Sequence, residues 1–228
     1  MSNEPRPQHP AWGAVARREP RWPASLAALT ALALYAALPE SLTEGPTWIV
    51  PVFEGLLLVP LTIAAPHRQR DESRPLRALA LALALIGLTS AANVGSLVLL
   101  VQLLLTGHSS HAGAPILLAA VQIWLTNVLV FALWYWELDR GGPGARLRAD
   151  HCHPDFLFPQ MITPACAVAA WSPGFVDYLY VSFTNATAFS PTDTMPLTAW
   201  AKILMVAQSL ASLLTVVLVA ARAVNILP

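Results

Sequence analysis

The chain has 228 residues, of which 56% are hydrophobic and only 11% are charged. Soluble globular proteins average about 25% charged residues, so this composition excludes a soluble domain and predicts a polytopic membrane protein of the all-α class. The formal net charge is zero. Without an excess of basic residues the chain has no electrostatic footprint for binding nucleic acid.

The first 22 residues are predicted to be a disordered basic tail. They contain four prolines and four arginines and no long apolar run, so they cannot bury enough surface to fold. The segment Ala24 to Leu38 follows, with 15 mostly apolar or small residues. It is either a short transmembrane helix that is retained or the hydrophobic region of a signal peptide. We favour the retained helix, because the preceding tail is long and proline-rich for a signal peptide.

Four further apolar segments approach or exceed the ~20 residues that a helix needs to cross a bilayer. Together with the first segment they predict a four-helix transmembrane region over residues 23 to 136 and, for the whole chain, a helical bundle of about five transmembrane helices. Lys202 is the only lysine among 13 basic residues, a usage typical of GC-rich bacterial genomes. The predicted location is therefore a bacterial inner (cell) membrane, which the chain crosses several times. The four segments are Ile49 to Ala65, Leu76 to Thr106, Ala114 to Trp136 and Trp200 to Val224.

The arginines predict which side of the membrane each connection faces. Residues 66 to 77 contain four arginines, whereas the connections at 39 to 47 and 107 to 113 contain no basic residue. By the positive-inside rule, the N-terminal tail and residues 66 to 77 are cytoplasmic and the other two connections lie outside. Residues 137 to 172 are predicted to be a polar Gly/Pro-rich loop on the inside. We expect a solvated helix end there, with Glu137 and Asp139 in water, and the alternative is a specific contact for Glu137 or Arg140.

The segment Pro173 to Thr187 has a helical pattern but is too short to cross the membrane. Its 15 residues rise about 22 Å as a helix, against ~30 Å of hydrocarbon. A polar loop, Ala188 to Pro196, leads from it into the last apolar segment. Irregular backbone at membrane depth is tolerated only where it is buried in protein or lines a wet cavity. Residues 173 to 228 are therefore predicted to form a re-entrant, pore-like hairpin and the last transmembrane helix.

This stretch resembles the pore helix, filter and inner-helix start of potassium channels, over about residues 175 to 225. Asp177 and Tyr178 resemble the aromatic start of the pore helix, Thr187 its last threonine, and Asp193 the aspartate that follows the filter. The whole chain is also similar to bacterial multi-pass membrane proteins that carry such a degenerate channel-like C-terminus. The resemblance implies an ion-channel-like protein that binds monovalent cations and assembles as a homo-oligomer, a tetramer in the channel family.

The filter itself departs from the potassium-channel pattern. Where the family has T-V-G-Y-G, this chain has Ala188, Phe189, Ser190, Pro191 and Thr192. Without the glycines, the backbone twist that points successive carbonyls at one axis is costly, and a proline fixes its own φ near −65°. The expected pore is therefore weakly selective or non-conducting, and Thr187 and Asp193 are the residues expected to contact a cation.

The side from which the hairpin enters poses a conflict. In potassium channels the pore loop enters from outside, whereas the arginine count places the start of this hairpin inside. Three explanations remain open. The hairpin is inverted, or Phe156 to Trp171 crosses the membrane, or one of the early apolar segments does not.

Polar residues within the apolar segments are the remaining candidates for a site. Gln208, Ser212 and Thr215 lie on one face of the last helix, because they are spaced by 4 and 3 residues. They either line an aqueous path or hydrogen-bond to neighbouring helices. Glu54 is an intramembrane carboxylate that either has a function or reaches the outer interface. For Asn127 we expect interhelical hydrogen bonding.

The sequence carries none of the familiar nucleotide-binding, zinc-protease or hydrolase motifs. The loop that holds His151, Cys152 and His153 offers too few ligands at motif spacing for a closed zinc site. We therefore predict no enzyme activity, no cofactor and no metal site, and the lipid bilayer as the main partner. Two alternatives to a channel-like function remain: a non-conducting membrane scaffold or partner subunit, and a membrane-embedded enzyme that uses Glu54 or the histidine loop.

The arginine distribution yields a testable topology. Single cysteines placed at Ser73 and at Ser110, with Cys152 and Cys166 replaced by serine, should react with a membrane-impermeant thiol reagent from opposite sides. Ser110 should be labelled in intact cells and Ser73 only after the membrane is opened, because the arginines near Ser73 hold that connection in the cytoplasm. Labelling of Ser73 from outside intact cells would overturn the topology.

Overall fold

The computed structural model describes residues 19–43, 52, 73–106, 113–147, 153–163, 171–188 and 193–226. The predicted span Ile49 to Ala65 with Glu54, and the filter-like residues Phe189 to Thr192, lie outside the described residues. The α-helices are α1 (Trp22–Ala36), α3 (Ser73–Thr106), α4 (Gly113–Leu138), α5 (Pro159–Ile162), α6 (Phe175–Ala188) and α7 (Ala199–Ile226). The shorter elements are the 3-10 helices η1 (Glu40–Leu42), η2 (Asp139–Gly141) and η3 (Ala145–Leu147) and the strands β1 (Phe156–Leu157) and β2 (Met195–Pro196).

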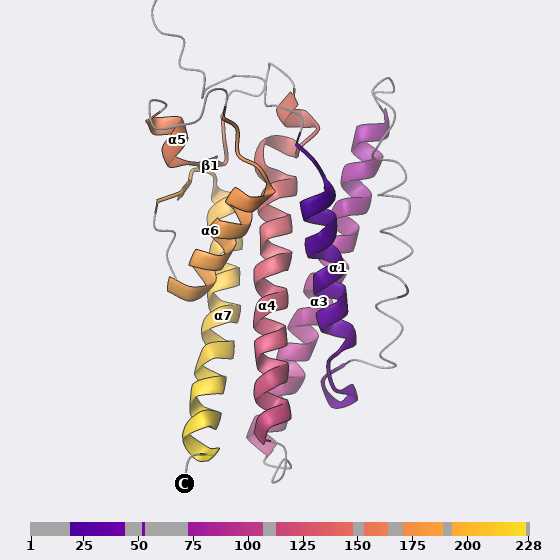
Figure 1. Ribbon diagram of the computed structural model, residues 1–228, viewed down its shortest axis with the longest axis vertical. Helices are drawn as coiled ribbons and strands as arrows, with labels where there is room; N and C mark the ends of the chain where they lie inside the picture. Colours follow the sequence, from indigo (N-terminus) through magenta and orange to yellow (C-terminus); the bar gives the residue numbers. More distant parts are fainter. Residues whose placement is uncertain are drawn as a thin grey trace, which may run out of the picture.

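The long helices form a bundle around α4 (Figure 1). This helix packs against α1, α3, α6 and α7, and it is the most buried of the three longest helices. Small residues such as Ala119 and Ala132 are fully buried along it, which allows the neighbouring backbones to approach closely. The predicted all-α class is thus confirmed for the described residues, in which the only sheet is the two-stranded pair of β1 and β2.

Three helices are long and apolar enough to cross a membrane, namely Leu79–Leu105, Ala114–Gly141 and Ala199–Ala221. The first predicted segment is also a helix, α1, but its 15 residues rise only about 22 Å. The chain is therefore compatible with a polytopic membrane protein. The described residues account for three of the roughly five predicted spans.

The sequence of α1 explains where the helix begins and which face it buries. Pro23 lies in the first turn, where its missing N–H is not needed. Ala24, Ala27 and Ala31 are buried at spacings of 3 and 4 residues, so they form one face of small side chains. That face allows α1 to pack closely against α4.

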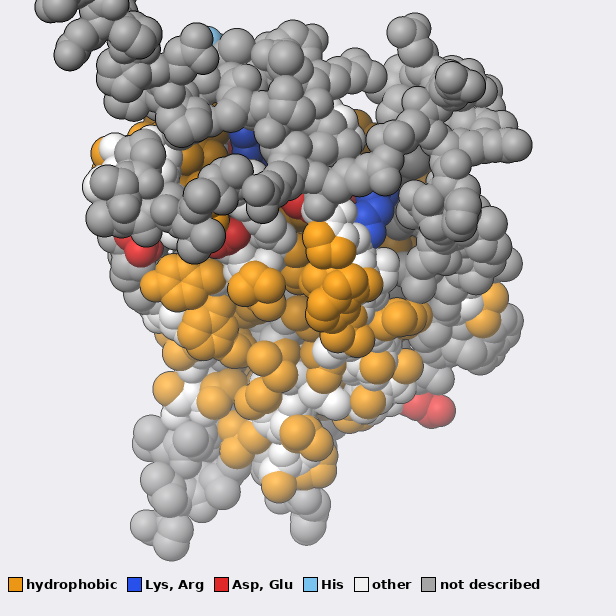
Figure 2. Space-filling model, turned by 45° about the horizontal axis from the view of Figure 1, so that its top comes forward, with side chains coloured by type: hydrophobic (Ala, Val, Ile, Leu, Met, Phe, Trp, Pro, Cys, Tyr) orange, Lys and Arg blue, Asp and Glu red, His pale blue; other side chains and the backbone are white. Residues whose placement is uncertain are grey.

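The bundle has two chemically different ends (Figure 1). We call the end that holds the start of α1 and the end of α4 the upper end, and the opposite one, with η1, the lower end. Most of the charged side chains visible in Figure 2 lie towards the upper end, whereas hydrophobic side chains cover the middle of the molecule. This distribution suits a bundle whose middle lies in hydrocarbon.

The described parts of the connection from α4 to α6 lie at the upper end. Strand β1 pairs antiparallel with β2, which precedes α7, through Phe156 opposite Pro196 and Leu157 opposite Met195. The rings of Phe158 and Trp171 are 5.9 Å apart, measured between centroids. The two ends of the segment Phe156 to Trp171 therefore lie close together, and residues 164 to 170 between them lie outside the described residues.

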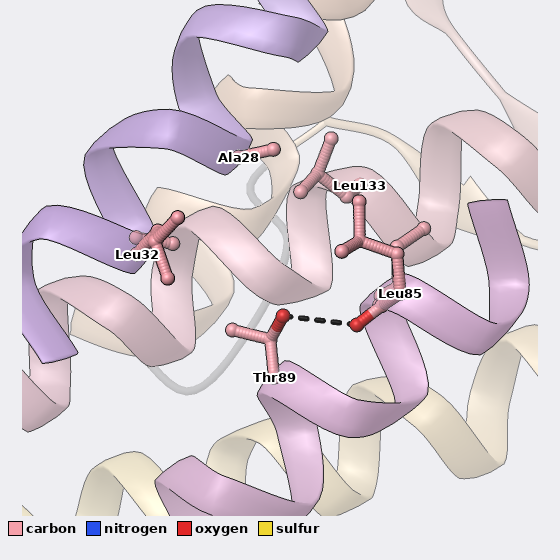
Figure 3. A pocket seen from close by; sticks show the side chains of 7 residues that line it. Ala28, Leu32, Leu85, Thr89 and Leu133 are labelled. Carbon is pink, nitrogen blue, oxygen red and sulfur yellow. Dashed lines mark hydrogen bonds between the residues drawn. The ribbon is translucent and has the colours of Figure 1, made fainter. Parts of the chain in front are cut away.

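A small apolar cavity lies between α1, α3 and α4, with Ala28, Leu32, Leu85 and Leu133 in its wall (Figure 3). Its volume is about 10 Å³, at the lower limit for holding one water molecule. The Thr89 hydroxyl donates a 2.9 Å hydrogen bond to the Leu85 carbonyl oxygen and so offers no free polar group. We regard this cavity as a packing defect rather than a binding site.

Candidate functional site

An acidic residue, Asp177, caps the first turn of helix α6. The backbone N–H of Gly174 donates a 2.8 Å hydrogen bond to a carboxylate oxygen of Asp177, the acid half of a capping box. A negative charge in the first turn is also favoured by the helix dipole. Burial raises the pKa of Asp177 above its ordinary value, and the hydrogen bond from Gly174 opposes part of this rise. The predicted pore-helix start is therefore a well-formed helix N-terminus.

The lower half of α6 lies against the middle of α4 and α7 through a buried polar network. Gln208 of α7 is fully buried, and its Oε1 accepts hydrogen bonds from the hydroxyl of Tyr135 (2.6 Å) and from Nδ2 of Asn185 (2.8 Å). Its Nε2 donates to the backbone oxygen of Ser182 (2.9 Å) and to the Ser182 hydroxyl (2.7 Å). The amide thus uses both its donors and accepts twice. The Gln208 side chain therefore links α7 both to α4, through Tyr135, and to α6, through Ser182 and Asn185.

Further hydrogen bonds surround this amide. The Ser182 hydroxyl donates to the Val128 carbonyl oxygen of α4 at 2.6 Å. Asn127 of α4 donates from Nδ2 to the Ser212 hydroxyl of α7 at 2.9 Å, so the expected interhelical bonding of Asn127 is confirmed. Asn185 donates to the Met205 carbonyl oxygen at 3.0 Å. Because these groups satisfy one another, the network tolerates a water-free surrounding.

The predicted stripe on α7 faces the interior of the chain. Gln208 and Ser212 are completely buried, and Thr215 is 3% exposed. The Thr215 hydroxyl donates back to the Ala211 carbonyl oxygen at 2.8 Å. These contacts are those of helix packing, and an aqueous path along the stripe stays a prediction about an assembly of several chains.

A second cluster lies at the upper end, around the fully buried carboxylate of Asp139. One of its oxygens accepts hydrogen bonds from the Tyr178 hydroxyl of α6 (2.6 Å) and from Nε of Arg140 (3.1 Å). The other oxygen accepts from the backbone N–H groups of Asp155 (2.9 Å) and Phe156 (3.4 Å). Asp139 therefore joins the end of α4 to β1 and to the start of α6.

Arg146 closes the C-terminal end of α4. Its Nη1 donates to the backbone oxygen of Trp136 (2.8 Å), in the last turn of α4, and to that of Asp139 (3.0 Å), just beyond the helix. Carbonyls at a helix C-terminus lack helical partners and are commonly satisfied in this way. Its Nε and Nη2 form a two-pronged ion pair with Glu19, at 3.1 and 3.0 Å. Glu19 also accepts a 2.6 Å hydrogen bond from the Trp136 indole N–H. Glu19, three residues before the start of α1, is thereby fixed to the end of α4.

Asp155 extends the cluster to α7. Its carboxylate accepts hydrogen bonds from the backbone N–H of Arg140 (2.7 Å) and from the indole N–H of Trp200 (3.0 Å). Its carbonyl oxygen accepts from the N–H of Leu197, at 2.8 Å. The start of α7 is thus held at the same end as the start of α6.

The turn after α4 depends on backbone that few residues adopt. Arg140 has φ of 54° and Gly142 has φ of 94°, both in the left-handed region. A Cβ on Gly142 would lie 2.8 Å from the backbone oxygen of Glu137. Only glycine fits there, which explains why the sequence has a Gly-Gly pair immediately after the helix.

The expected solvation of this region is wrong. Glu137 is 4% exposed, Asp139 0% and Arg140 8%. The reason is tertiary: Asp155 and Tyr178, which lie 16 and 39 residues further along the chain, bring their own donors and acceptors to the end of α4. Residues 137 to 172 thus include a folded, buried polar core within the part that the structure describes.

Of the filter-like residues, the structure describes Thr187, Ala188 and Asp193. Thr187, in the last turn of α6, is exposed, and its hydroxyl donates to the Phe183 carbonyl oxygen at 2.9 Å. Ala188 is the last residue of α6, and Asp193 is exposed just before β2. The four residues between them, and Glu54, lie outside the described residues.

Sequence reasoning missed Tyr135, Ser182 and Asn185 as partners of Gln208. A signal was available, because Tyr178, Ser182 and Asn185 recur at spacings of 4 and 3 and therefore share one face of α6. That polar face indicates contact with other polar side chains of the bundle.

Comparison with protein-family models, curated proteins and solved structures finds no match to this chain.

The cluster around Asp139 gives a stability prediction. Asp139→Asn keeps the shape of the side chain but removes the charge that faces Arg140 and Arg146, so the free energy of unfolding should fall by about 3–5 kcal/mol. Unfolding in mixed micelles, followed by tryptophan fluorescence, measures the change. The matched control is Glu40→Gln, an exposed carboxylate at the lower end, which should alter stability by less than ~0.5 kcal/mol. Equal stability of the Asp139→Asn protein and the wild type would show that the cluster does not hold the fold.

Proposed function

We propose that this chain is an ion-channel-like membrane protein whose α6 and following loop form a re-entrant hairpin. One observation carries the proposal. Asn185, near the C-terminal end of α6, bonds to Met205 and Gln208 well along α7, whereas Met195, ten residues later, pairs with β1 at the upper end. The chain enters the bundle and returns to the end from which it came.

The depth of the hairpin follows from helix geometry. Gln208 is the tenth residue of α7, so it lies about 14 Å below the start of that helix. Helix α6 has 14 residues and a length of about 21 Å, less than the ~30 Å of hydrocarbon. Its C-terminal end, the negative pole of the helix dipole, lies near the mid-depth of the bundle and at its outer edge (Figure 1), where Thr187 is exposed. That pole favours a cation.

The hairpin is inverted relative to potassium channels. The Arg-rich side is cytoplasmic by the positive-inside rule, and the upper end carries Arg140 and Arg146. The hairpin accordingly enters from the cytoplasmic side. Cation attraction comes from Thr187 and the Asp193 carboxylate rather than from a ring of glycine-supported carbonyls.

A homo-oligomer is part of this proposal, because one chain supplies one hairpin. Helix α7 is the least buried of the three long helices. Its exposed apolar side chains include Ile203, Val206 and Leu210, at 68%, 59% and 62% exposure. This face is available to a second copy, and a tetramer is the assembly that the channel resemblance implies.

The second candidate is a non-conducting scaffold or partner subunit. The specific observation in its favour is the stripe of Gln208, Ser212 and Thr215, which is used up in contacts within one chain. In this alternative the hairpin serves packing alone.

Ion flux tests the channel-like function. In planar bilayers the purified protein should give a current with comparable sodium and potassium permeability, because the filter lacks the Gly-aromatic-Gly element. Asp193→Asn should lower this current several-fold, and the control Glu40→Gln, a carboxylate at the lower end, should leave it unchanged. A strong preference for potassium contradicts the proposed cation contacts, and an absence of current under all conditions favours the scaffold.

Cysteine accessibility separates the two candidates independently of current. With Cys152 and Cys166 replaced by serine, Ser212→Cys should stay unreactive towards a small water-soluble thiol reagent if the stripe only packs. It should react if the assembled protein has a wet path along α7. Ile203→Cys, on the exposed face, reports whether that face meets lipid or another copy and serves as the comparison.

A further inference from the structure

An apolar groove lies between α1 and α6, with α4 as its floor. Its volume is about 500 Å³, within the range of ~300–1,000 Å³ that small-molecule sites occupy. It is far larger than the cavity of Figure 3, and it is open to the surroundings of the bundle. Its walls are Thr30 and Leu34 of α1, Leu125, Val128 and Leu129 of α4, and Val176, Leu179, Tyr180 and Phe183 of α6.

The side chains that line the groove determine which kind of ligand it can bind. No charged side chain is among the described residues that line the groove. The hydroxyl of Thr30 donates to the Leu26 carbonyl oxygen at 2.8 Å and is thus engaged within its own helix. A polar ligand would lose its hydrogen bonds to water here and regain few. The groove therefore suits hydrocarbon.

The groove also lies at the depth of hydrocarbon. Its floor, Leu125 to Leu129, is the middle of α4, which extends from Gly113 to Leu138 and is long enough to cross a membrane. At this level Ser182 of α6 bonds to Val128, so α6 and α4 are in contact beside the groove. In a bilayer, what meets this opening is lipid or another protein chain.

The walls decide between these two. Helices associate in lipid through small residues and interhelical hydrogen bonds, whereas the described walls of this groove are leucine, valine, phenylalanine, tyrosine and one threonine whose hydroxyl is engaged. The volume of about 500 Å³ instead suits a single flexible hydrocarbon chain. Half-exposed side chains such as Tyr180 and Phe183, at 51% and 47%, leave the groove open to such a chain.

We propose that this groove binds one acyl chain of a bilayer lipid, which packs against Leu179 and Phe183 of α6. The bound chain fills the space that arises because α6 lies over only part of α4. Occupancy of the groove does not depend on conduction, so the inference stands apart from the channel-like function. It assigns a lipid site to the same helix that forms the hairpin.

The first test uses the wild-type protein. It is reconstituted in phospholipid bilayers that contain a small fraction of lipid with a photoreactive diazirine on the acyl chain, irradiated, and mapped by mass spectrometry. Labelling of Leu179 to Phe183 and of Leu125 to Leu129 should exceed labelling of the exposed α3 face at Val94 and Val98, 55% and 48% exposed, several-fold. Equal labelling of both regions means ordinary bulk lipid only and overturns the proposal. Strong labelling of α3 with almost none in the groove means that a protein partner covers it, which also overturns the proposal.

A variant pair provides the second test. Leu125→Trp places a larger side chain on the groove floor, and Leu214→Trp makes the same change on α7 at similar exposure, 37% against 43% for the two leucines. Leu125→Trp should reduce labelling of Tyr180 and Phe183 to the level of the α3 face at Val94 and Val98, and Leu214→Trp should leave it unchanged. Unreduced labelling in a folded Leu125→Trp protein contradicts a bound chain. If that variant does not fold, the wild-type map alone decides.

Discussion

The buried carboxylate of Asp139 is the constraint on which the upper half of the structure depends. It lies just beyond the C-terminal end of α4, where the helix dipole is itself negative, so an unpaired charge there is unfavourable. Four hydrogen-bond donors and the cations of Arg140 and Arg146 offset this cost. The donors are the side chain of Arg140 beside it, the backbone N–H groups of Asp155 and Phe156 at β1, and the hydroxyl of Tyr178 in α6. As a result, satisfying one charge brings the end of α4, β1 and the start of α6 together.

This constraint has a particular value in a membrane protein. Between helices in lipid the hydrophobic effect provides no attraction, because lipid tails are as apolar as leucine. Close packing and polar contacts must hold the elements together instead. Helix α6 is fixed twice in this way, through Tyr178 at the upper end and through Ser182 and Asn185 one and two turns further along. A helix that does not cross the membrane requires such fixed points, since it cannot anchor itself at both interfaces.

The same arrangement explains the contrast between the two faces of α6. Tyr178, Ser182 and Asn185 face the bundle, whereas Val176, Tyr180 and Phe183 are exposed. The polar face determines how deep the helix lies, and the apolar face forms one wall of the groove beside α1. A lipid chain in that groove and a cation near Thr187 would therefore act on one helix from different sides.

The sequence by itself determined the class of the protein and most of its helices. The low charge and long apolar runs predict a membrane protein, with which the three long apolar helices of the described residues are compatible. The predicted segments 76 to 106, 114 to 136 and 200 to 224 agree with α3, α4 and α7 to within three residues at each end. Periodicity placed Gln208, Ser212 and Thr215 on one face, because spacing along a helix is a local property. Only the tertiary structure decided what that face contacts, and that Glu137, Asp139 and Arg140 are buried rather than solvated. The physical reason is that burial of a polar residue depends on partners distant in sequence, such as Asp155 and Tyr178. No local pattern around residue 139 encodes those partners.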